Sequence, residues 1–449
     1  MRSRFCDLFF VCIFGVALNG ASQPNVIICM TDDQGWGDVG YAGHDQAYTP
    51  HLDAMAKSGI RFERFYANAP MCSPTRAGTL TGRNNLRYNI GGPIATGRGH
   101  LRAAEITLAE ALRPEGYVTG HFGKWHLGDV LDEGGQEHLM HPGLAGFDVW
   151  FSTQNVLPTV NPYQGKFGKS QHYYRNGVYV PESDGITGDD SRIVMNEVLD
   201  FVRKQVRNER PFFAFVCFHA MHNPLVLVPE FRKHYPDITD KKQLGYYTNL
   251  TAIDEAMGRL RTELSDLGVS DKTMLWFCSD NGPLIKSEES VGSKGPFRGA
   301  KGQLYEGGIR VPGLLEWPSV IRQPRVEKRM VVTTDLFPTV LDIVGVDLPD
   351  RPYDGESLRP LIEGKSFQRT KPVGFAAKGW RAWQDGRYKL LKHKGHDAPW
   401  ELYHIEADPY ETVDLAAQKP EILTVMVKQL TEWVASCERS AKNGPIKNP

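Results

Sequence analysis

Short runs of almost continuous apolar residues alternate along the chain with longer stretches in which apolar residues recur every three or four positions. The short runs are NVIICM (25–30), YVTGHFG (117–123), PFFAFVCF (211–218), TMLWFCS (273–279) and GLLEWP (313–318). Such runs are typical of parallel strands that are covered on both faces. Amphipathic helices are predicted for four longer stretches, 49–59, 107–116, 191–206 and 244–268. Together the two patterns predict a doubly wound α/β core, with a mainly parallel sheet flanked by helices.

The pattern changes after about residue 346. WRAWQDGRYKLLKH (380–393) predicts a β-hairpin that turns at Asp385 and Gly386, and WELYHI (400–405) predicts a further strand. EILTVMVKQLTEWVASCERS (421–440) predicts a closing helix. We therefore expect an α/β domain over 23–345 and a smaller C-terminal α+β subdomain over 346–449.

The first residues have the features of an export signal. Arg2 and Arg4 precede the apolar run FFVCIFGVAL (9–18), and the small residues Gly20, Ala21 and Ser22 follow it. The apolar run is too short for a comfortable membrane span. We expect a signal peptide over 1–22, and an uncleaved anchor is the alternative. The mature protein is expected to be periplasmic or secreted.

The charges are balanced: 52 lysines and arginines face 53 aspartates and glutamates, for a net charge of -1. No run of like charge stands out. This excludes binding to nucleic acid or to a membrane surface through bulk charge, so we expect neither partner for the mature chain. An anionic substrate would have to be bound by local cations.

Seven cysteines give no regular spacing, and Cys6 and Cys12 fall in the predicted signal peptide. An odd number without a pattern argues against a disulfide framework. Three cysteines interrupt hydrophobic runs and are expected to be buried thiols: Cys29, Cys217 and Cys278. Cys437 lies on the predicted closing helix.

The remaining cysteine, Cys72, lies in NAPMCSPTRAGTLTGR (68–83). Ser73 before Pro74 fits an N-cap followed by proline in the first helical turn. Cys72 would then lie at a helix N-terminus, where the helix dipole lowers the pKa of a thiol and makes it reactive, with Arg76 one turn into the helix. From the residues alone, a small residue that fills a turn is an equally good interpretation.

Oxygen ligands follow two of the predicted strands. Asp32 and Asp33 come directly after the first strand, in MTDDQGWGD, and Asp280 and Asn281 end another, in WFCSDNG. Ligand sites in open α/β sheets lie beyond the carboxyl ends of the strands. Three carboxylates and one amide oxygen suit a hard cation, Ca²⁺ or Mg²⁺, rather than zinc. For the Asp-Asp pair alone, a solvated turn is the alternative.

Cationic residues follow strand-like runs in three fragments. They are Lys124 and His126 in FGKWHLG, His219 and His222 in FHAMHNP, and Lys301 in the Gly-rich RGAKGQLYEGGIRVP. Each fragment alone is only a weak indication of a functional site, because single lysines and histidines are usually surface or packing residues. Five of them at strand ends, in a chain of near-zero net charge, favour a site that binds a tetrahedral anion.

These fragments also carry a resemblance. CSPTRAGTLTGR fits the signature Cys-x-Pro-x-Arg followed by Thr-Gly-Arg, and TDDQGWGD, GKWHLG, SDNG and KGQLYEGGIRVP occur in the matching order. The chain resembles the type I, formylglycine-dependent sulfatases of the alkaline-phosphatase superfamily over nearly its whole mature length. Within these it is most similar to arylsulfatases and N-acetylgalactosamine-6-sulfatases. The resemblance implies an alkaline-phosphatase-like core, with 23–345 as the catalytic domain. It also implies hydrolysis of sulfate esters, of aryl groups or carbohydrates, with galactose-series 6-sulfates weakly favoured.

The resemblance also implies roles for individual residues. A formylglycine-generating enzyme would oxidise Cys72 to formylglycine, whose hydrated aldehyde attacks sulfur and then releases sulfate. One Ca²⁺ per chain would be held by Asp32, Asp33, Asp280, Asn281 and the modified Cys72. The other matched positions are Arg76 and Lys124, which hold the hydrated aldehyde, His126 as its base, His222 as the leaving-group acid, and Lys301 on the sulfate. His219 competes with His222 for the acid role.

Two other functions remain open at this point. A metal-dependent phosphatase or phosphodiesterase of the same superfamily would use a serine or threonine nucleophile and usually two metals with extra histidine ligands. A non-catalytic glycan-binding relative would be expected to lose Cys72 or a metal ligand, and none is lost. We expect the loops 91–105 and 158–185 and the hairpin around Trp380 and Trp383 to close the substrate pocket. The alternative is that both tryptophans pack the subdomain onto the core.

Overall fold

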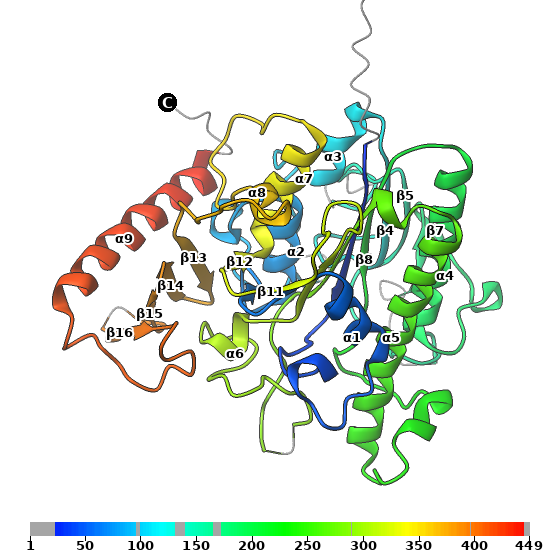
Figure 1. The fold of residues 1–449 in the computed structure, drawn as a ribbon, viewed down its shortest axis with the longest axis horizontal. Coiled ribbons are helices and arrows are strands. Elements are labelled where there is room, and N and C mark those ends of the chain that lie inside the picture. Colours follow the sequence, from blue (N-terminus) through cyan, green and yellow to red (C-terminus); the bar gives the residue numbers. More distant parts are fainter. Residues whose placement is uncertain are drawn as a thin grey trace, which may run out of the picture.

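A computed structural model describes residues 23–95, 99–130, 140–164, 172–288, 290–395 and 397–443. The predicted signal peptide lies outside the described residues. Figure 1 shows a large sheet with helices on both sides and, at the left, a small sheet covered by the long red helix α9. The predicted α/β core and the predicted C-terminal elements are thus confirmed, whereas the exact domain boundaries stay a prediction.

Within the described residues, ten strands form the main sheet. In order across the sheet they are β11 (Arg325–Glu327), β2 (Ile60–Phe62), β10 (Gly313–Glu316), β9 (Thr273–Ser279), β1 (Asn25–Thr31), β8 (Phe212–Cys217), β4 (Val118–Lys124), β5 (Val149–Thr153), β6 (Tyr174–Arg175) and β7 (Val178–Tyr179). The five central strands, from β9 to β5, all run parallel. Two more strands, β3 (Phe65–Tyr66) and β12 (Val331–Val332), pair separately.

One strand runs against its prediction. The sequence predicts residues 313–318 as another parallel strand, but β10 is antiparallel to β9 and to β2. The reason lies in the connection after β9, which remains at the carboxyl edge of the sheet: Gly282 N donates to Gly308 O at 3.0 Å. The helix in this connection, α6 (Glu306–Ile309), is a single turn and does not cross the sheet. A chain that re-enters from the edge where it left must run antiparallel.

The central strands are buried at nearly every position because both faces of the sheet are covered. Side chains alternate along a strand, so Val26, Ile28 and Met30 of β1 enter one cluster and Ile27 and Cys29 enter the other. The first cluster includes side chains of α2 (Cys72–Thr81), α3 (Leu108–Leu112), α7 (Leu336–Val344) and α8 (Arg359–Ile362). The second includes side chains of α1 (Pro50–Ser58), α4 (Asp190–Arg207) and α5 (Lys241–Asp266). The three thiols predicted to be buried, Cys29, Cys217 and Cys278, are buried and free, and so is Cys437.

The C-terminal sheet is antiparallel, in the order β13 (Val373–Ala377), β14 (Trp380–Asp385), β15 (Tyr388–Lys392) and β16 (Trp400–His404). The predicted hairpin turns at Asp385 and Gly386, where glycine provides a φ of 58°. The closing helix α9 (Pro420–Asn443) covers the sheet, and Trp383 packs on Trp433 and donates to Gln429 Oε1 at 3.0 Å. Trp383 therefore packs inside the subdomain, between its sheet and α9, whereas the alternative predicted that it packs the subdomain onto the core.

A buried charge cluster joins this sheet to the core. Lys389 of β15 donates to Glu306 at 2.9 Å and pairs with Glu411 at 2.8 Å, and all three side chains are buried. Tyr66 donates to the second oxygen of Glu306 at 2.7 Å. Because Glu306 begins α6, the cluster fixes the end of the Gly-rich loop that carries Lys301.

Replacing Lys389 with methionine should lower the free energy of unfolding by about 3 kcal/mol, because it leaves two buried carboxylates without the lysine as their ion-pair partner. Chemical denaturation measures the change. Lys365→Met is the matched control: its partner is also a glutamate, but the lysine side chain is 70% exposed, and such pairs contribute little. Equal shifts for the two variants would contradict the assigned role of Lys389.

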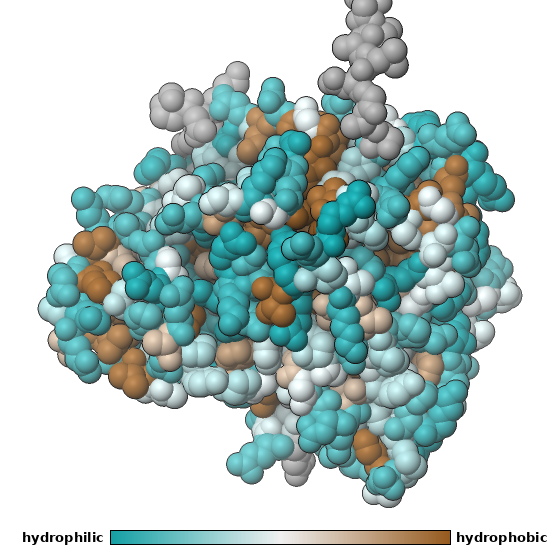
Figure 2. All heavy atoms as spheres, viewed as in Figure 1, coloured by the Kyte–Doolittle hydropathy of each residue, from teal (hydrophilic) through white to brown (hydrophobic). Residues whose placement is uncertain are grey.

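The surface in Figure 2 is mainly hydrophilic, with apolar side chains in small separate groups. Among the described helices, none is both long and apolar enough to cross a bilayer.

Candidate active site

Four parallel strands deliver the predicted site residues to one edge of the sheet. Asp32 and Asp33 follow β1, Asp280 and Asn281 follow β9, the histidine segment 219–222 follows β8, and Lys124 is the last residue of β4. Their carboxyl ends meet because β9, β1, β8 and β4 are neighbours. The structure therefore brings together fragments that are up to about 250 residues apart in the chain.

Cys72 is the first residue of α2, and the N-cap is Met71, without a side-chain capping bond. The predicted N-cap role of Ser73 is therefore wrong: its hydroxyl accepts from Ile94 N at 2.9 Å instead. The predicted lowering of the Cys72 pKa is also wrong. Burial raises the pKa of this thiol, and Asp280 and Asp32 add to that effect.

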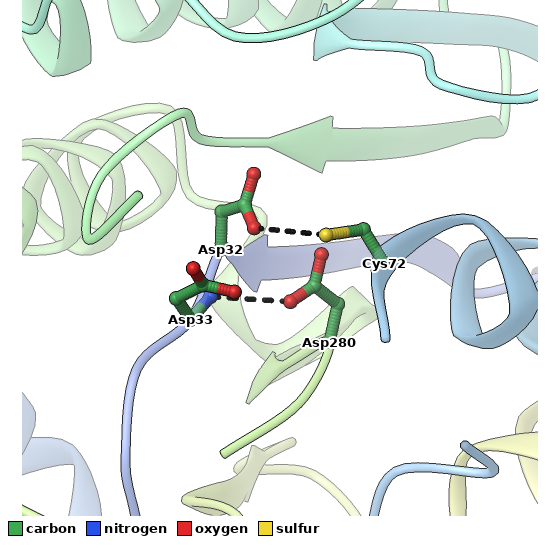
Figure 3. A group of neighbouring side chains, drawn as sticks. All are labelled: Asp32, Asp33, Cys72 and Asp280. Carbon is green, nitrogen blue, oxygen red and sulfur yellow. Dashed lines mark hydrogen bonds between the residues drawn. The ribbon is translucent and has the colours of Figure 1, made fainter. Parts of the chain in front are cut away.

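Three carboxylates and the thiol converge on one point (Figure 3). Ligand atoms of Asp32, Asp33, Cys72 and Asp280 all lie within 4.8 Å of one another. Cys72 Sγ lies 3.3 Å from Asp32 Oδ1, and Asp33 N donates to Asp280 Oδ1 at 3.2 Å. All four side chains are buried. Buried carboxylates at this separation repel each other unless cations compensate them.

Asn281 completes the set of oxygen donors. Its Nδ2 donates to Asp33 Oδ1 at 2.7 Å, which leaves its Oδ1 buried and without a hydrogen-bond partner. A buried carbonyl oxygen without a partner is costly unless a cation or proton binds it. The donors thus fit a hard divalent cation.

Three cationic side chains surround the carboxylates. Arg76 donates to Asp280 Oδ2 from Nε and Nη2, at 3.1 and 2.7 Å, and Lys124 forms an ion pair with Asp32. Lys301 Nζ lies 2.7 Å from Asp33 Oδ2 and 3.7 Å from Cys72 Sγ. Burial opposes ionisation of Asp32, but Lys124 and its other cationic neighbours hold the pKa of this carboxyl well below its ordinary value.

Three residues next to or within the site, Gly123, His126 and Asp33, have positive φ values. Gly123 has a φ of 94°, and a Cβ there would lie 2.0 Å from the carbonyl oxygen of Cys217, so β4 approaches β8 more closely than any other residue allows. His126 and Asp33 have φ values of 56° and 60°, which cost non-glycine residues energy and gather at functional sites.

His126 is buried, and neither ring nitrogen has a hydrogen-bond partner. Burial, reinforced by Lys124 and Arg76, holds its pKa well below the ordinary value. The ring is therefore neutral, and its unprotonated nitrogen carries a lone pair.

His222 is the histidine that faces the acidic cluster. Its Nε2 lies 3.8 Å from Asp33 Oδ2, and its side chain is 24% exposed. Nδ1 lies 2.6 Å from the carbonyl oxygen of Asn223. A carbonyl oxygen only accepts hydrogen bonds, so Nδ1 carries a hydrogen. Nε2 is therefore the nitrogen that can exchange a proton with a bound molecule. The competing choice, His219, is fully buried and bonds to Asp190 and Thr153 instead.

A cavity of about 320 Å³ opens beside Asp33. Its walls include Met221, Asn223, Leu225, Tyr246 and Val291, with Lys242 and Lys286 as lining cations. Among the residues that the structure describes, the lining of this cavity comes from neither of the predicted loops, 91–105 and 158–185, nor from the hairpin around Trp380. Trp380 instead stacks on His393 at 4.1 Å between ring centroids. The sequence offered no signal for the segment 284–292, because its composition is that of an ordinary surface loop.

Comparisons with known proteins agree with this geometry. The family model described as Sulfatase matches residues 24–346, and one described as N-sulphoglucosamine sulphohydrolase, C-terminal, matches 297–438. N-acetylgalactosamine-6-sulfatase of Homo sapiens is 36% identical over 408 residues, which cover 86% of this chain and 74% of the relative. Arylsulfatase A of Homo sapiens is 30% identical over 472 residues, or 95% and 90% of the two chains. The crystal structure of Ps i-CgsB in complex with k-i-k-neocarrahexaose is similar with a TM-score of 0.83, at 28% identity, over 93% of this chain and 94% of the other.

Proposed function

Since the chain belongs to the sulfatase family and is a sulfuric ester hydrolase, we propose that it removes sulfate from carbohydrates with a formylglycine made from Cys72 and one bound Ca²⁺. One observation carries this proposal. Residue 72 lies within 4.8 Å of three carboxylates from two strand ends, and Lys301 reaches both it and Asp33.

The cation would be held by Asp32, Asp33, Asp280 and Asn281, together with residue 72. The unpartnered Oδ1 of Asn281 supports this assignment, because binding a cation satisfies it. An all-oxygen set that includes several carboxylates favours Ca²⁺, which takes six to eight oxygen ligands. When bound, the cation supplies positive charge that polarises the sulfate ester.

The motif Cys72-x-Pro74-x-Arg76 supports modification by a formylglycine-generating enzyme. When formed, the aldehyde supplies a hydrated carbonyl whose hydroxyl attacks sulfur. Cys72 is 1% exposed and every residue of α2 is buried, so the modifying enzyme must reach Cys72 before folding is complete.

The remaining residues bind and move protons. Lys301 binds the sulfate oxygens, and Arg76 and Lys124 orient residue 72 through the carboxylates that they contact. The neutral ring of His126 takes a proton at one of its unpartnered nitrogens. His222 gives a proton from Nε2 to the oxygen of the departing alcohol.

His222→Ala should reduce kcat/KM for sugar sulfates by roughly 10²–10⁴-fold and for activated aryl sulfates much less. A phenolate of low pKa leaves without a proton, whereas a sugar alkoxide needs one. Steady-state kinetics with both substrate types measures the difference, and His404→Ala, on the C-terminal sheet, is the control. Equal losses on both substrates would mean that His222 only positions the sulfate.

The substrate is proposed to be a sulfated carbohydrate, with galactose-series 6-sulfates first. Support comes from the similarity to a protein named N-acetylgalactosamine-6-sulfatase and to a structure that holds a neocarrahexaose. Sulfate release should be measured on galactose, galactosamine and glucosamine sulfates varied at each hydroxyl, with phosphate monoesters in parallel. A preference for a 2- or 4-sulfate would overturn the 6-sulfate assignment. Turnover of aryl sulfates alone would overturn the carbohydrate assignment, and faster phosphate release would favour the phosphatase alternative.

We also propose that the reaction takes place in the periplasm or outside the cell. The signal-like features of residues 1–22 support this proposal. N-terminal sequencing of exported protein should give a start near Ala21 or Ser22, and a retained Met1 would contradict cleavage.

A further inference from the structure

His219 is fully buried, and both of its ring nitrogens are engaged. Nδ1 lies 2.8 Å from Asp190 Oδ2, and Nε2 lies 2.7 Å from Thr153 Oγ1. Tyr173 donates its hydroxyl to the other carboxylate oxygen, Asp190 Oδ1, at 2.6 Å. These four side chains are all buried, and none belongs to the metal or catalytic sets assigned above.

The hydroxyl of Thr153 decides the state of one nitrogen. Its single hydrogen is donated to the carbonyl oxygen of Asn155 at 2.7 Å. The Thr153 oxygen can therefore only accept from His219, so Nε2 must carry a hydrogen.

The other nitrogen faces a carboxylate. Asp190 is the first residue of α4, where the helix dipole favours a negative charge, and it accepts from Tyr173. An ionised carboxylate only accepts, so Nδ1 carries a hydrogen as well. A neutral imidazole has one N–H, whereas this ring donates from both nitrogens, so the pair is an imidazolium and a carboxylate.

The charges around the ring agree with this assignment. The pKa of His121 on β4 is held well below its ordinary value, mainly by burial and also by the charges of Arg76 and His219. That ring is therefore neutral. Burial and Asp190 raise the pKa of Asp189, the N-cap of α4, to about 7. Burial and Asp190 also raise the pKa of Tyr173, which keeps its hydroxyl as a donor. Asp190 is the carboxylate in contact with the ring.

His219 connects the two segments that carry the proton-moving histidines. Its carbonyl oxygen accepts from His222 N at 3.0 Å. On the other side, Thr153 ends β5, and its carbonyl accepts from Trp125 N at 2.9 Å, while the next carbonyl accepts from His126 N at 2.9 Å. The segment between His219 and His222 also contacts the first of the proposed metal ligands, since Asp32 N donates to Ala220 O at 3.0 Å.

We propose that His219 is a positioning residue, held as an imidazolium between Asp190 and Thr153, that fixes His222 relative to the Lys124–His126 segment. Two charge-assisted hydrogen bonds hold the ring more firmly than neutral ones would. The kinetic consequence rests on the proposed acid role of His222. Without the ion pair, His222 is displaced from the leaving oxygen, and substrates that need a proton suffer most.

The protonation state can be measured without turnover. The full chain labelled with ¹⁵N-histidine should show one ring with two protonated nitrogens at pH 7 to 8, and its signals should be missing in His219→Gln. Tyr173→Phe, which removes one donor to Asp190, should shift the same signals and provides the assignment if His219→Gln does not fold. A neutral tautomer at His219 would overturn the imidazolium.

Kinetics tests the positioning role. In Asp190→Asn and His219→Gln, the ratio of kcat/KM for sugar sulfate to that for activated aryl sulfate should fall by roughly 10- to 100-fold, as expected for a small misplacement of a reacting group. A purely structural role would lower both rates equally through loss of folded enzyme. Asp200→Asn, an exposed carboxylate on the same helix, is the control and should leave the ratio unchanged.

His222→Ala separates this inference from the proposed function. If His222→Ala lowers the ratio and the Asp190 and His219 variants do not, the positioning role is overturned. If His222→Ala leaves the ratio unchanged, the proposed acid role fails, and the protonation measurement alone decides whether the imidazolium stands.

Discussion

Asp33→Ala should remove the bound divalent cation and reduce kcat by roughly 10³-fold or more, since a catalytic cation contributes several kcal/mol of charge stabilisation. Asp33 lies at the centre of the site: its oxygens accept from Asn281 Nδ2 and from Lys301 Nζ, and its ligand atoms are close to those of Asp32 and Asp280. Removing Asp33 leaves one carboxylate fewer for the cation and takes away the ion-pair partner of Lys301.

The measurement is metal content after dialysis, taken on the samples used for kinetics. Asp33→Asn separates charge from backbone, because asparagine tolerates the φ of 60° at this position better than alanine does. Asp237→Ala, an exposed aspartate, should retain both metal and rate. Wild-type turnover by Asp33→Ala after chelation would show that the site is wrongly assigned.

Cys72→Ala should reduce turnover of every sulfate ester by roughly 10⁴-fold or more, as loss of a nucleophile does in other hydrolases. Alanine fits the space left by the thiol at the start of α2, where residue 72 is almost fully buried. The fold should therefore survive, and the cation should remain on the aspartates and Asn281.

Circular dichroism and metal content establish that the Cys72→Ala protein is intact. Cys437→Ala is the matched control, because Cys437 is also a free, buried thiol but lies on α9. A Cys72→Ala enzyme that retained activity on sugar or aryl sulfates would exclude residue 72 as the nucleophile.

The strands and long helices were predictable because their patterns are local. β1 is apolar at all five of its inner positions, 26–30, since helices cover both faces of the sheet, and α4 and α5 repeat apolar residues with the helical period. The site residues were predictable for a related reason. Parallel strands end at one edge, so Asp32 and Asp280 had to lie close together once their strands were neighbours.

Features that depend on distant contacts were not predictable. The direction of β10 depends on where the 280–312 connection lies, and the hydroxyl of Ser73 bonds to Ile94 rather than capping α2. The Cys72 prediction failed because the helix dipole was weighed without the burial and the two carboxylates that oppose it. His219 was seen only as a rival to His222, because its partners Asp190 and Thr153 lie 29 and 66 residues away.

The central claim is that sulfate esters are cleaved by a formylglycine at position 72. Mass spectrometry of the peptide that contains residue 72, from a preparation whose activity has been measured, tests it most directly. The account predicts that sulfur is lost and a carbonyl gained, in a fraction of the protein that rises in step with specific activity when the modifying enzyme is co-expressed. A fully active preparation in which residue 72 is an unmodified thiol would contradict the account.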